Sequence, residues 1–170
     1  MLEPAQLYKE ELKKKMVSTW YNLEYQYYWS NYYEEPNFEK NNNNDIYNRQ
    51  FAFVEDNKVT GYFSYTFDNS TKSLYNMGLL SFEKPNYHFI KAVIKHIKWL
   101  FDEKIIDRIE FFAYEDNPAI KGYDKILERF GGKRVGKLTR SQKLYDGKLH
   151  NTILYEILRE DYESASLRRI

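Results

Sequence analysis

The chain has 170 residues, with 26 lysines and arginines against 25 aspartates and glutamates, so its net charge is +1. A hydrophobic share of 42% and a charged share of 30% are typical of a folded protein, and a charge this close to zero gives no electrostatic reason to expect nucleic acid or an anionic membrane as partner. Cysteine is absent, which excludes disulfides, thiolate metal sites and a cysteine nucleophile.

The first residues predict neither a secretory leader nor a membrane anchor. Met1-Leu2-Glu3-Pro4 lacks a basic start and an apolar stretch, and no run approaches the roughly 18 apolar residues of a membrane span. We therefore expect a cytoplasmic protein. Because no repeat or linker is visible, we expect one domain over residues 1–170, with a helical region at 5–33, a loop at 34–49, a core at 50–160 and a tail at 161–170.

Apolar side chains recur every three or four residues from about Ala5 to Trp29, which is the period of a helix. Aromatic residues crowd its second half and continue to Tyr33, densely enough to break the helix into two. The polar stretch that follows, from Glu34 to Asn48, contains four successive asparagines and predicts a long loop or lid.

Alternation of apolar and polar residues then predicts three consecutive strands, over Gln50–Glu55, Val59–Phe67 and Ser73–Phe82. Short turns at Asp56-Asn57 and at Asp68–Lys72 separate these strands. Strands joined by such short turns pair with their neighbours, so we expect an antiparallel meander.

Helical period returns over Phe89–Phe101, and a short strand follows at Arg108–Tyr114. A helix that connects two strands of one sheet makes those strands parallel, so the sheet is predicted to be mixed. Asn117-Pro118 then begins another helix, because asparagine caps helices and proline fits their first turn. Gly131-Gly132 ends that helix.

Two further strands are predicted over Lys133–Leu144 and Lys148–Leu158, joined by a turn at Asp146-Gly147. The remaining residues, from Glu160 to Ile170, are predicted to be loosely held.

This order of elements resembles the GNAT (GCN5-related N-acetyltransferase) superfamily, with one strand missing at the front. Local agreement is best in Asp107-Arg108-Ile109-Glu110, in Asp116-Asn117-Pro118-Ala119-Ile120, and in the endings Leu127–Gly132 and Ile153–Leu158, which resemble the ribosomal-protein N-acetyltransferase branch. The resemblance covers roughly residues 51–160. It implies an α/β (α+β) fold, in which helices flank a mixed, mostly antiparallel sheet of about six strands.

The resemblance also implies acetyl-CoA as cosubstrate. The family binds it in a V-shaped gap between two parallel strands, which here correspond to Ser73–Phe82 and Arg108–Tyr114. Main-chain contacts are then expected from Gly78, Leu79 and Leu80, and the glycine would let a ligand approach closely.

The family's pyrophosphate loop reads R/Q-x-x-G-x-G/A at the start of the next helix, where amide groups meet negative charge. Here Lys84 falls near the signature arginine, whereas Pro85, Tyr87 and Phe89 replace glycines. Side chains at these positions are expected to crowd a phosphate. In this degenerate loop the implied cofactor contacts come from Lys84, Asn86, Tyr87 and His88, with Asn117 at the next helix start.

Catalysis in the family needs a base for the amine and an acid for the leaving thiolate. The residue at the family's tyrosine position is Leu127, which cannot donate a proton. Tyr123 lies one turn earlier on the same helix face and is the candidate acid, although core packing is an alternative role. Glu110 is the candidate base, with a solvated strand position as its alternative.

We therefore expect an N-acetyltransferase that passes an acetyl group from acetyl-CoA to an amine, either a peptide N-terminus or a small molecule, by direct attack. The alternative is a non-catalytic binding or assembly module that keeps the fold without normal acetyl-CoA binding. The histidines are too widely spaced for a metal site, so no metal is predicted. The aromatic cluster would line the acceptor side of the cleft, or form a homodimer contact.

Overall fold

The computed structural model describes residues 1–38, 42–43, 46–84 and 86–168. Its strands are β1 (Leu2–Pro4), β2 (Asn42–Asn43), β3 (Ile46–Glu55), β4 (Lys58–Asp68), β5 (Ser73–Ser81), β6 (Arg108–Tyr114), β7 (Lys133–Lys143) and β8 (Leu149–Leu158). Its helices are η1 (Ala5–Tyr8), α1 (Lys9–Ser18), η2 (Leu23–Tyr25), α2 (Gln26–Trp29), α3 (Tyr87–Asp102), α4 (Ile120–Phe130) and α5 (Arg159–Leu167). Within these described ranges, no helix is long and apolar enough to cross a membrane.

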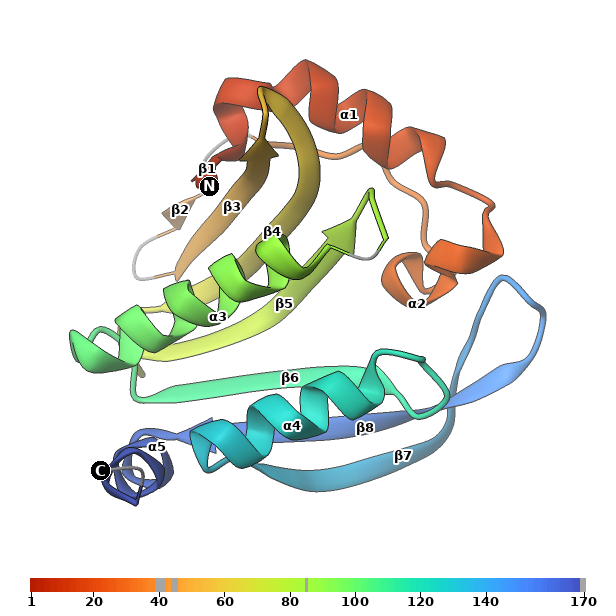
Figure 1. Cartoon of the computed structure of the whole chain (residues 1–170). Coiled ribbons are helices and arrows are strands. Elements are labelled where there is room, and N and C mark those ends of the chain that lie inside the picture. The colour runs from red at the N-terminus through yellow and green to blue at the C-terminus, as the bar shows by residue number, and fades with distance from the viewer. Residues whose placement is uncertain (39–41, 44–45, 85, 169–170) are drawn as a thin grey trace.

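The strands form one sheet in the order β1-β3-β4-β5-β6-β8-β7, and β2 pairs with β3 (Figure 1). The predicted meander of β3, β4 and β5 is confirmed as antiparallel, and the predicted parallel pair is that of β5 with β6. A mixed, mostly antiparallel sheet is therefore confirmed, with more strands than the six expected. Strand β3 begins at Ile46, inside the predicted loop, of which residues 39–41 and 44–45 lie outside the described residues.

A strand does precede the first helix, so the prediction of a missing front strand is wrong. Leu2 lies opposite Phe53 in the β1–β3 ladder, and the N-terminal ammonium of Met1 donates a hydrogen bond to the carbonyl of Val54 at 2.5 Å. Three residues ending in Pro4 are too few to show a strand period, which is why the sequence pattern does not reveal β1.

The predicted N-terminal helix is divided in its aromatic half, as expected. Helix α1 ends at Ser18, and Tyr21 has a left-handed backbone with φ of 56°. Asn22 then caps η2, because its side-chain oxygen accepts a hydrogen bond from the amide of Glu24 at 3.0 Å. The chain turns back here, so α2 reaches the sheet beside β5 (Figure 1).

The tail is a helix, so its prediction as a loose segment is wrong. The ring of Tyr162 in α5 stacks on Phe101, with centroids 4.6 Å apart, and its hydroxyl donates to Asp102 Oδ1 at 2.6 Å. Arg159 Nε donates to Asp107 Oδ1, also at 2.6 Å. These anchors lie more than 50 residues away in the chain, so no local pattern indicates them.

Two hydrophobic clusters lie on opposite faces of the sheet. Phe63 of β4 packs in one with Val93 of α3, whereas the adjacent Tyr62 packs in the other with Leu12 of α1. Successive strand residues point to opposite faces, so α1 and α3 cover opposite faces of the same strands. Helices α3 and α4 run on one face, over β5 and β6 (Figure 1).

Candidate active site

Strands β5 and β6 pair only at one end. Ser73 lies opposite Arg108 and Leu74 opposite Ile109, and no further pair joins these two strands within the described residues. Beyond this point β5 follows β4 and β6 follows β8, and the two strands diverge (Figure 1). The predicted divergence of the two strands is thus present, and it leaves an open wedge between them.

Main-chain groups of β5 point alternately towards β4 and into the wedge. The amide of Phe82 donates to the carbonyl of Thr60 on β4 at 3.0 Å. Because bonded and non-bonded pairs alternate along an antiparallel ladder, Gly78 and Leu80 also turn their main-chain groups towards β4. Leu79, between them, turns its N–H and C=O into the wedge.

The opposite wall follows the same alternation. The amide of Glu115 donates to the carbonyl of Asn151 at 3.0 Å, in register with the ladder between β6 and β8. Phe112 and Tyr114 are therefore non-bonded positions of that ladder, and their main-chain groups face the wedge. Both walls thus offer hydrogen-bonding backbone to a ligand.

An irregularity in β5 sets which side chains face which side. The pairing of β4 with β5 slips between Ser64 and Thr66, and Asn76 on the facing strand has a φ of 51°. Asparagine tolerates this left-handed conformation better than most residues do. As a result Leu74 and Met77, three residues apart, both pack on the α3 side.

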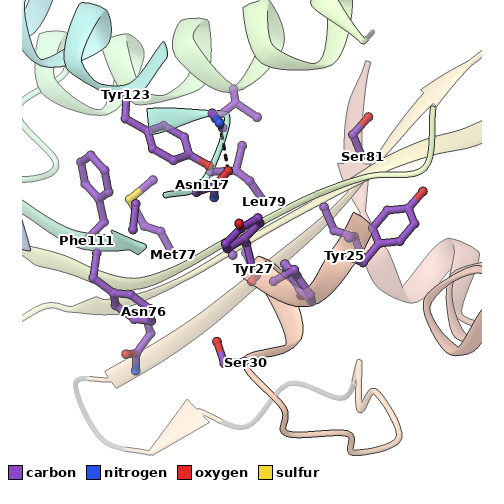
Figure 2. Close-up of a pocket in the computed structure, with 18 of the residues that line it drawn as sticks. Tyr25, Tyr27, Ser30, Asn76, Met77, Leu79, Ser81, Phe111, Asn117 and Tyr123 are labelled. Carbon is purple, nitrogen blue, oxygen red and sulfur yellow. Dashed lines mark hydrogen bonds between the residues drawn. The ribbon is translucent and has the colours of Figure 1, made fainter. Parts of the chain in front are cut away.

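A cavity of about 820 Å³ lies in the wedge and is lined from both faces of the sheet. On the α3 and α4 side its lining includes Met77, Val93, Phe111, Asn117 and Tyr123. On the α2 side it includes Tyr25, Tyr27, Tyr28, Ser30 and Tyr114. Figure 2 shows Tyr123 and Asn117 on one side of β5, with Tyr25 and Tyr27 on the other. The cavity therefore connects the two faces through the wedge.

No protein-family model and no curated protein matches this sequence. Solved structures match in fold. The microcin C7 self-immunity acetyltransferase MccE, in complex with acetyl-CoA and AMP, is 20% identical with a TM-score of 0.65, and the match covers 92% of this chain and 91% of the MccE chain in that structure. The ribosomal-protein-S5-alanine acetyltransferase from Vibrio fischeri is 22% identical with a TM-score of 0.53, over 70% of this chain and 64% of that one. These proteins are GNAT acetyltransferases.

This chain has the GNAT fold. RimL, a ribosomal L7/L12 α-N-protein acetyltransferase in complex with coenzyme A, shares it at 16% identity and a TM-score of 0.53, with 66% of this chain covered. The chain spans 62% of the length of RimL, and 63% and 64% of two further acetyltransferase structures. Most of these GNAT-fold proteins thus extend beyond the region matched here.

Three residues were expected to give main-chain contacts in this GNAT fold, and all of them, Gly78, Leu79 and Leu80, line the cavity. Only Leu79 turns its main-chain groups into the wedge, so the expectation of main-chain contacts is wrong for Gly78 and Leu80, whose groups face β4. A Cβ on Gly78 would lie 2.7 Å from Ser64 Oγ and 3.4 Å from Tyr28 Cε2. The missing side chain therefore makes room for two neighbours on the α2 side. Burial raises the pKa of Tyr28 well above its ordinary value, so its hydroxyl stays protonated.

The residues expected to hold the pyrophosphate are only partly brought together. Lys84 lines the cavity, with Nζ 4.5 Å from the ring centroid of Tyr25. The side-chain oxygen of Asn86 accepts a hydrogen bond from the amide of Phe89 at 3.0 Å, and its NH₂ group donates to the carbonyl of Thr60 at 3.2 Å. Asn86 thus caps α3 and occupies one of its first amide groups.

Neither Tyr87 nor His88 contributes to the described lining of the cavity. Tyr87 is 77% exposed, and His88 Nδ1 lies 2.5 Å from Glu55 Oε1. Their side chains lie on the outside of the first turn of α3, whereas the main chain of this turn remains near the open end of the wedge.

Phe89 does not crowd the loop, so that expectation is wrong for this residue. Its side chain is buried, and a Cβ on Gly61 of β4 would lie only 2.9 Å from its Cγ. The ring centroid of Phe53 lies 5.5 Å away. A glycine in the neighbouring strand thus receives the ring, and Phe89 packs into the core at the base of α3.

Tyr123 borders the cavity from α4, where its ring meets that of Phe111 edge-on, with centroids 6.0 Å apart. Burial raises the pKa of Tyr123 above its ordinary value. Asn117 lies beside it in Figure 2 and accepts a hydrogen bond from the amide of Ala119 at 2.9 Å, drawn there as a dashed line. Leu127 is buried, one turn further along the helix.

Glu110 is placed away from these residues. It is absent from the described lining of the cavity, and Arg108 Nη2 donates to its Oε2 at 2.7 Å. Its side chain is exposed on the sheet face opposite α4.

Sequence reasoning missed a polar group on the α2 side. The hydroxyls of Ser30 and Tyr114 are 2.5 Å apart, and both residues line the cavity. Ser30 has a left-handed backbone with φ of 52°, which ends α2 and turns its hydroxyl to the sheet. The only sequence signal is that Tyr114 ends a strand facing the predicted cleft, whereas nothing in the pattern places Ser30 opposite it.

Proposed function

We propose that this protein transfers an acetyl group from acetyl-CoA directly to an amine. The observation that carries the proposal is the cavity that joins both faces of the sheet through the wedge. A direct transfer needs a donor and an acceptor that meet at one point, held by groups already in place. Two structures of the same fold support the donor, since MccE is in complex with acetyl-CoA and RimL with coenzyme A.

The donor would enter at the first turn of α3 and lie along β5. The pantetheine arm carries two amide groups, and the main chain of Leu79 and Ser81 faces the wedge at two points about 7 Å apart. The pyrophosphate would then meet the first amides of α3, at Tyr87 and His88, where the helix dipole favours negative charge. Lys84, whose ammonium group lies over the ring of Tyr25, comes shortly before this turn in the sequence. Its positive charge would therefore add to the attraction for the pyrophosphate.

In the chemical step the amine nitrogen attacks the thioester carbonyl, the new C–N bond forms, and the C–S bond breaks. The departing thiolate needs a proton. We assign that proton to Tyr123, which borders the cavity and stays protonated because burial raises its pKa. The position of Glu110 outside the cavity does not support a role as base, so the amine would lose its proton to water.

The acceptor would enter from the α2 side, which is lined by Tyr25, Tyr27 and Tyr28. Carboxylates of Glu24 and Glu34 also belong to this lining and favour a cationic amine. A peptide N-terminus and a small-molecule amine both fit this description. Structures of the same fold include a ribosomal-protein acetyltransferase and a spermidine N-acetyltransferase chimera.

The alternative is a GNAT-fold binding or assembly module without normal acetyl-CoA binding. Leu127 at the tyrosine position, and Asn86 as the cap of α3, favour this alternative. It predicts a wedge filled by side chains, whereas a cavity of about 820 Å³ supports the enzyme.

Calorimetric titration of the full chain with acetyl-CoA and with CoA tests the donor site. We expect both to bind and to raise the melting midpoint, because ligands that bind only the native state stabilise it. Absence of binding at millimolar acetyl-CoA would leave only the alternative. Binding without acetyl transfer to a panel of peptide and polyamine acceptors would contradict the proposed transfer while leaving the donor site in place.

A further inference from the structure

Two hydroxyl groups reach the cavity beside Gly78, on the α2 side of β5. Ser64 and Tyr28 both belong to the lining, and a Cβ on Gly78 would lie 2.7 Å from Ser64 Oγ and 3.5 Å from Tyr28 Oη. Within the described residues, the buried side-chain polar atoms that lack a hydrogen-bond partner belong to Trp20 and Tyr155. Tyr28 Oη forms no hydrogen bond with the described residues and is not one of these buried atoms, so it is open to the cavity.

The hydroxyl of Ser64 is oriented by a chain of hydrogen bonds behind it. Gln50 Nε2 donates to the carbonyl of Asn37 at 3.0 Å, and Gln50 Oε1 accepts from Tyr62 Oη at 2.9 Å. Burial raises the pKa of Tyr62 to about 12, and a hydrogen bond with Ser64 partly opposes that rise. Because Tyr62 has already given its one proton to Gln50, Ser64 is the donor in this bond. Ser64 Oγ therefore presents only lone pairs to the cavity.

The polarity of these hydroxyls limits what a ligand can offer them. A group that meets Ser64 Oγ must donate a hydrogen, and Tyr28 Oη can accept another because its lone pairs are unused. A neutral primary amine carries two N–H groups and one lone pair. With one N–H on each hydroxyl, the lone pair of the nitrogen stays free to attack.

The two hydroxyls also lie where the acceptor would meet the donor. The pantetheine arm, placed along the main chain of Ser81 and Leu79, would bring its thioester to about Met77. The Cα atom of Met77 is about 3.8 Å from that of Gly78, because the two residues are adjacent in the chain. An amine that enters from the α2 side would therefore reach the wedge at the pair of hydroxyls.

We propose that Ser64 and Tyr28 bind the reacting nitrogen of the acceptor by its two N–H groups, and that this contact makes the protein selective for primary amines. The inference rests on the proposed function. A neutral secondary amine has a single N–H and leaves one hydroxyl unpaired. The reaction itself is unchanged: the C–N bond forms, the C–S bond breaks, the nitrogen gives one proton to water, and the thiolate takes one from Tyr123.

Matched acceptors test the selectivity. The value of kcat/KM is measured at saturating acetyl-CoA for benzylamine and N-methylbenzylamine, and for a tetra-alanine peptide and its N-terminally methylated form. We expect the original chain to prefer the primary amine of each pair. In Tyr28→Phe and in Ser64→Ala we expect kcat/KM for the primary amine to fall about 3- to 10-fold, the effect of one hydrogen bond, and that for the secondary amine to fall less than about twofold.

The ratio between the two amines separates this role from simple crowding by the methyl group. A steric preference would leave the ratio unchanged in both variants and would overturn the assignment. Tyr33→Phe makes the same change as Tyr28→Phe outside the described lining, and should leave both rates as they are. Acetyl-CoA affinity by calorimetry should stay within about twofold in every variant, because these hydroxyls meet the acceptor and not the donor.

Failure of the original chain to acetylate any amine would remove the proposed function itself. Transfer to primary amines with an unaltered ratio in Tyr28→Phe and Ser64→Ala would remove only the present inference. The two failures are therefore distinguishable.

Tyr62→Phe provides a second test if Tyr28→Phe does not fold. This change keeps the ring and removes the acceptor for the Ser64 proton, so the Ser64 hydroxyl can turn to the cavity as a donor. We expect the ratio of primary to secondary amine to fall in Tyr62→Phe, with no further fall when Ser64→Ala is added. A ratio equal to that of the original chain would contradict the orientation of Ser64.

Discussion

The ring of His150 bridges two carboxylates, with Nδ1 2.7 Å from Asp116 Oδ2 and Nε2 3.0 Å from Asp146 Oδ1. Both ring nitrogens donate at once only in the imidazolium form. Burial opposes that charge, but the two carboxylates outweigh it and raise the pKa of His150 above its ordinary value. The ring thereby ties the loop before α4 to the turn between β7 and β8, beside Tyr27 on the α2 side of the site.

This bridge predicts a pH-dependent stability. Since the pKa of His150 is higher in the folded protein, the bridge contributes its full stability below the unfolded pKa of about 6.5 and loses it as the pH rises through the folded value. We expect the free energy of unfolding to fall as the pH rises above about 6.5 and through the folded pKa in the original chain, relative to His150→Gln. Urea unfolding of both proteins across this range measures the difference, and parallel curves would contradict the bridge.

Phe89 and Gly61 should behave as a pair. Gly61→Ala would place a methyl group 2.9 Å from Phe89 Cγ, so we expect a loss of about 1–3 kcal/mol in stability from overpacking. In Phe89→Leu the same glycine change should cost less, because the smaller side chain leaves room. A double-mutant cycle by urea unfolding measures this coupling, and simple additivity would refute the contact.

Two glycines differ in what surrounds them. Gly78→Ala would bring a methyl group to 2.7 Å from Ser64 Oγ, so we expect it to destabilise by about 1–3 kcal/mol. Gly122→Ala, in α4, has no heavy atom within 4 Å of the new methyl group and should stabilise by about 0.5–1 kcal/mol. Thermal melting of both variants gives the comparison, and Ser64→Ala should relieve the loss in Gly78→Ala.

Tyr123 should matter for the chemical step more than for donor binding. Removing its hydroxyl in Tyr123→Phe leaves the ring contact with Phe111, so we expect near-original stability and acetyl-CoA affinity. If it supplies the proton to the thiolate, the turnover number should fall by about 10²- to 10⁴-fold. Steady-state kinetics with an amine acceptor measures it. Tyr27→Phe, which also keeps its ring in the cavity lining, is the control and should change turnover far less.

Much of the fold follows from local patterns in the sequence. The three meander strands, the parallel crossover and the helix that ends before Gly131-Gly132 were predictable because alternation, helical period and glycine turns each act over a few residues. This helix begins at Ile120, so its predicted start with Asn117 as cap and Pro118 as first residue is wrong. Strand β1 and helix α5 were not predictable, since β1 is three residues long and α5 is held by Phe101 and Asp107, far from it in the chain.

The candidate site was predictable in outline, and its details depend on distant partners. The wedge was expected from the resemblance to the GNAT family, and so was an acid on the helix before Gly131, for which Tyr123 was the candidate one turn from the family's position. The capping of α3 by Asn86 involves Thr60, and the burial of Phe89 depends on Gly61, which no pattern near residue 86 reveals. The bulge at Asn76 was also not predicted. One extra residue changes the face to which the following side chains of β5 point, but the strand itself continues.

The short ladder between β5 and β6 has a consequence for how the sheet holds together. Within the described residues, only Ser73 and Leu74 of β5 have register partners on β6, and beside them the carbonyl of Lys72 accepts hydrogen bonds from the amides of Asp107 and Arg108. A bound molecule with amides of its own, seated against Leu79, would add the rungs that the polypeptide lacks. The ligand would then extend the hydrogen bonding between β5 and β6 beyond Leu74, in the manner of an added strand.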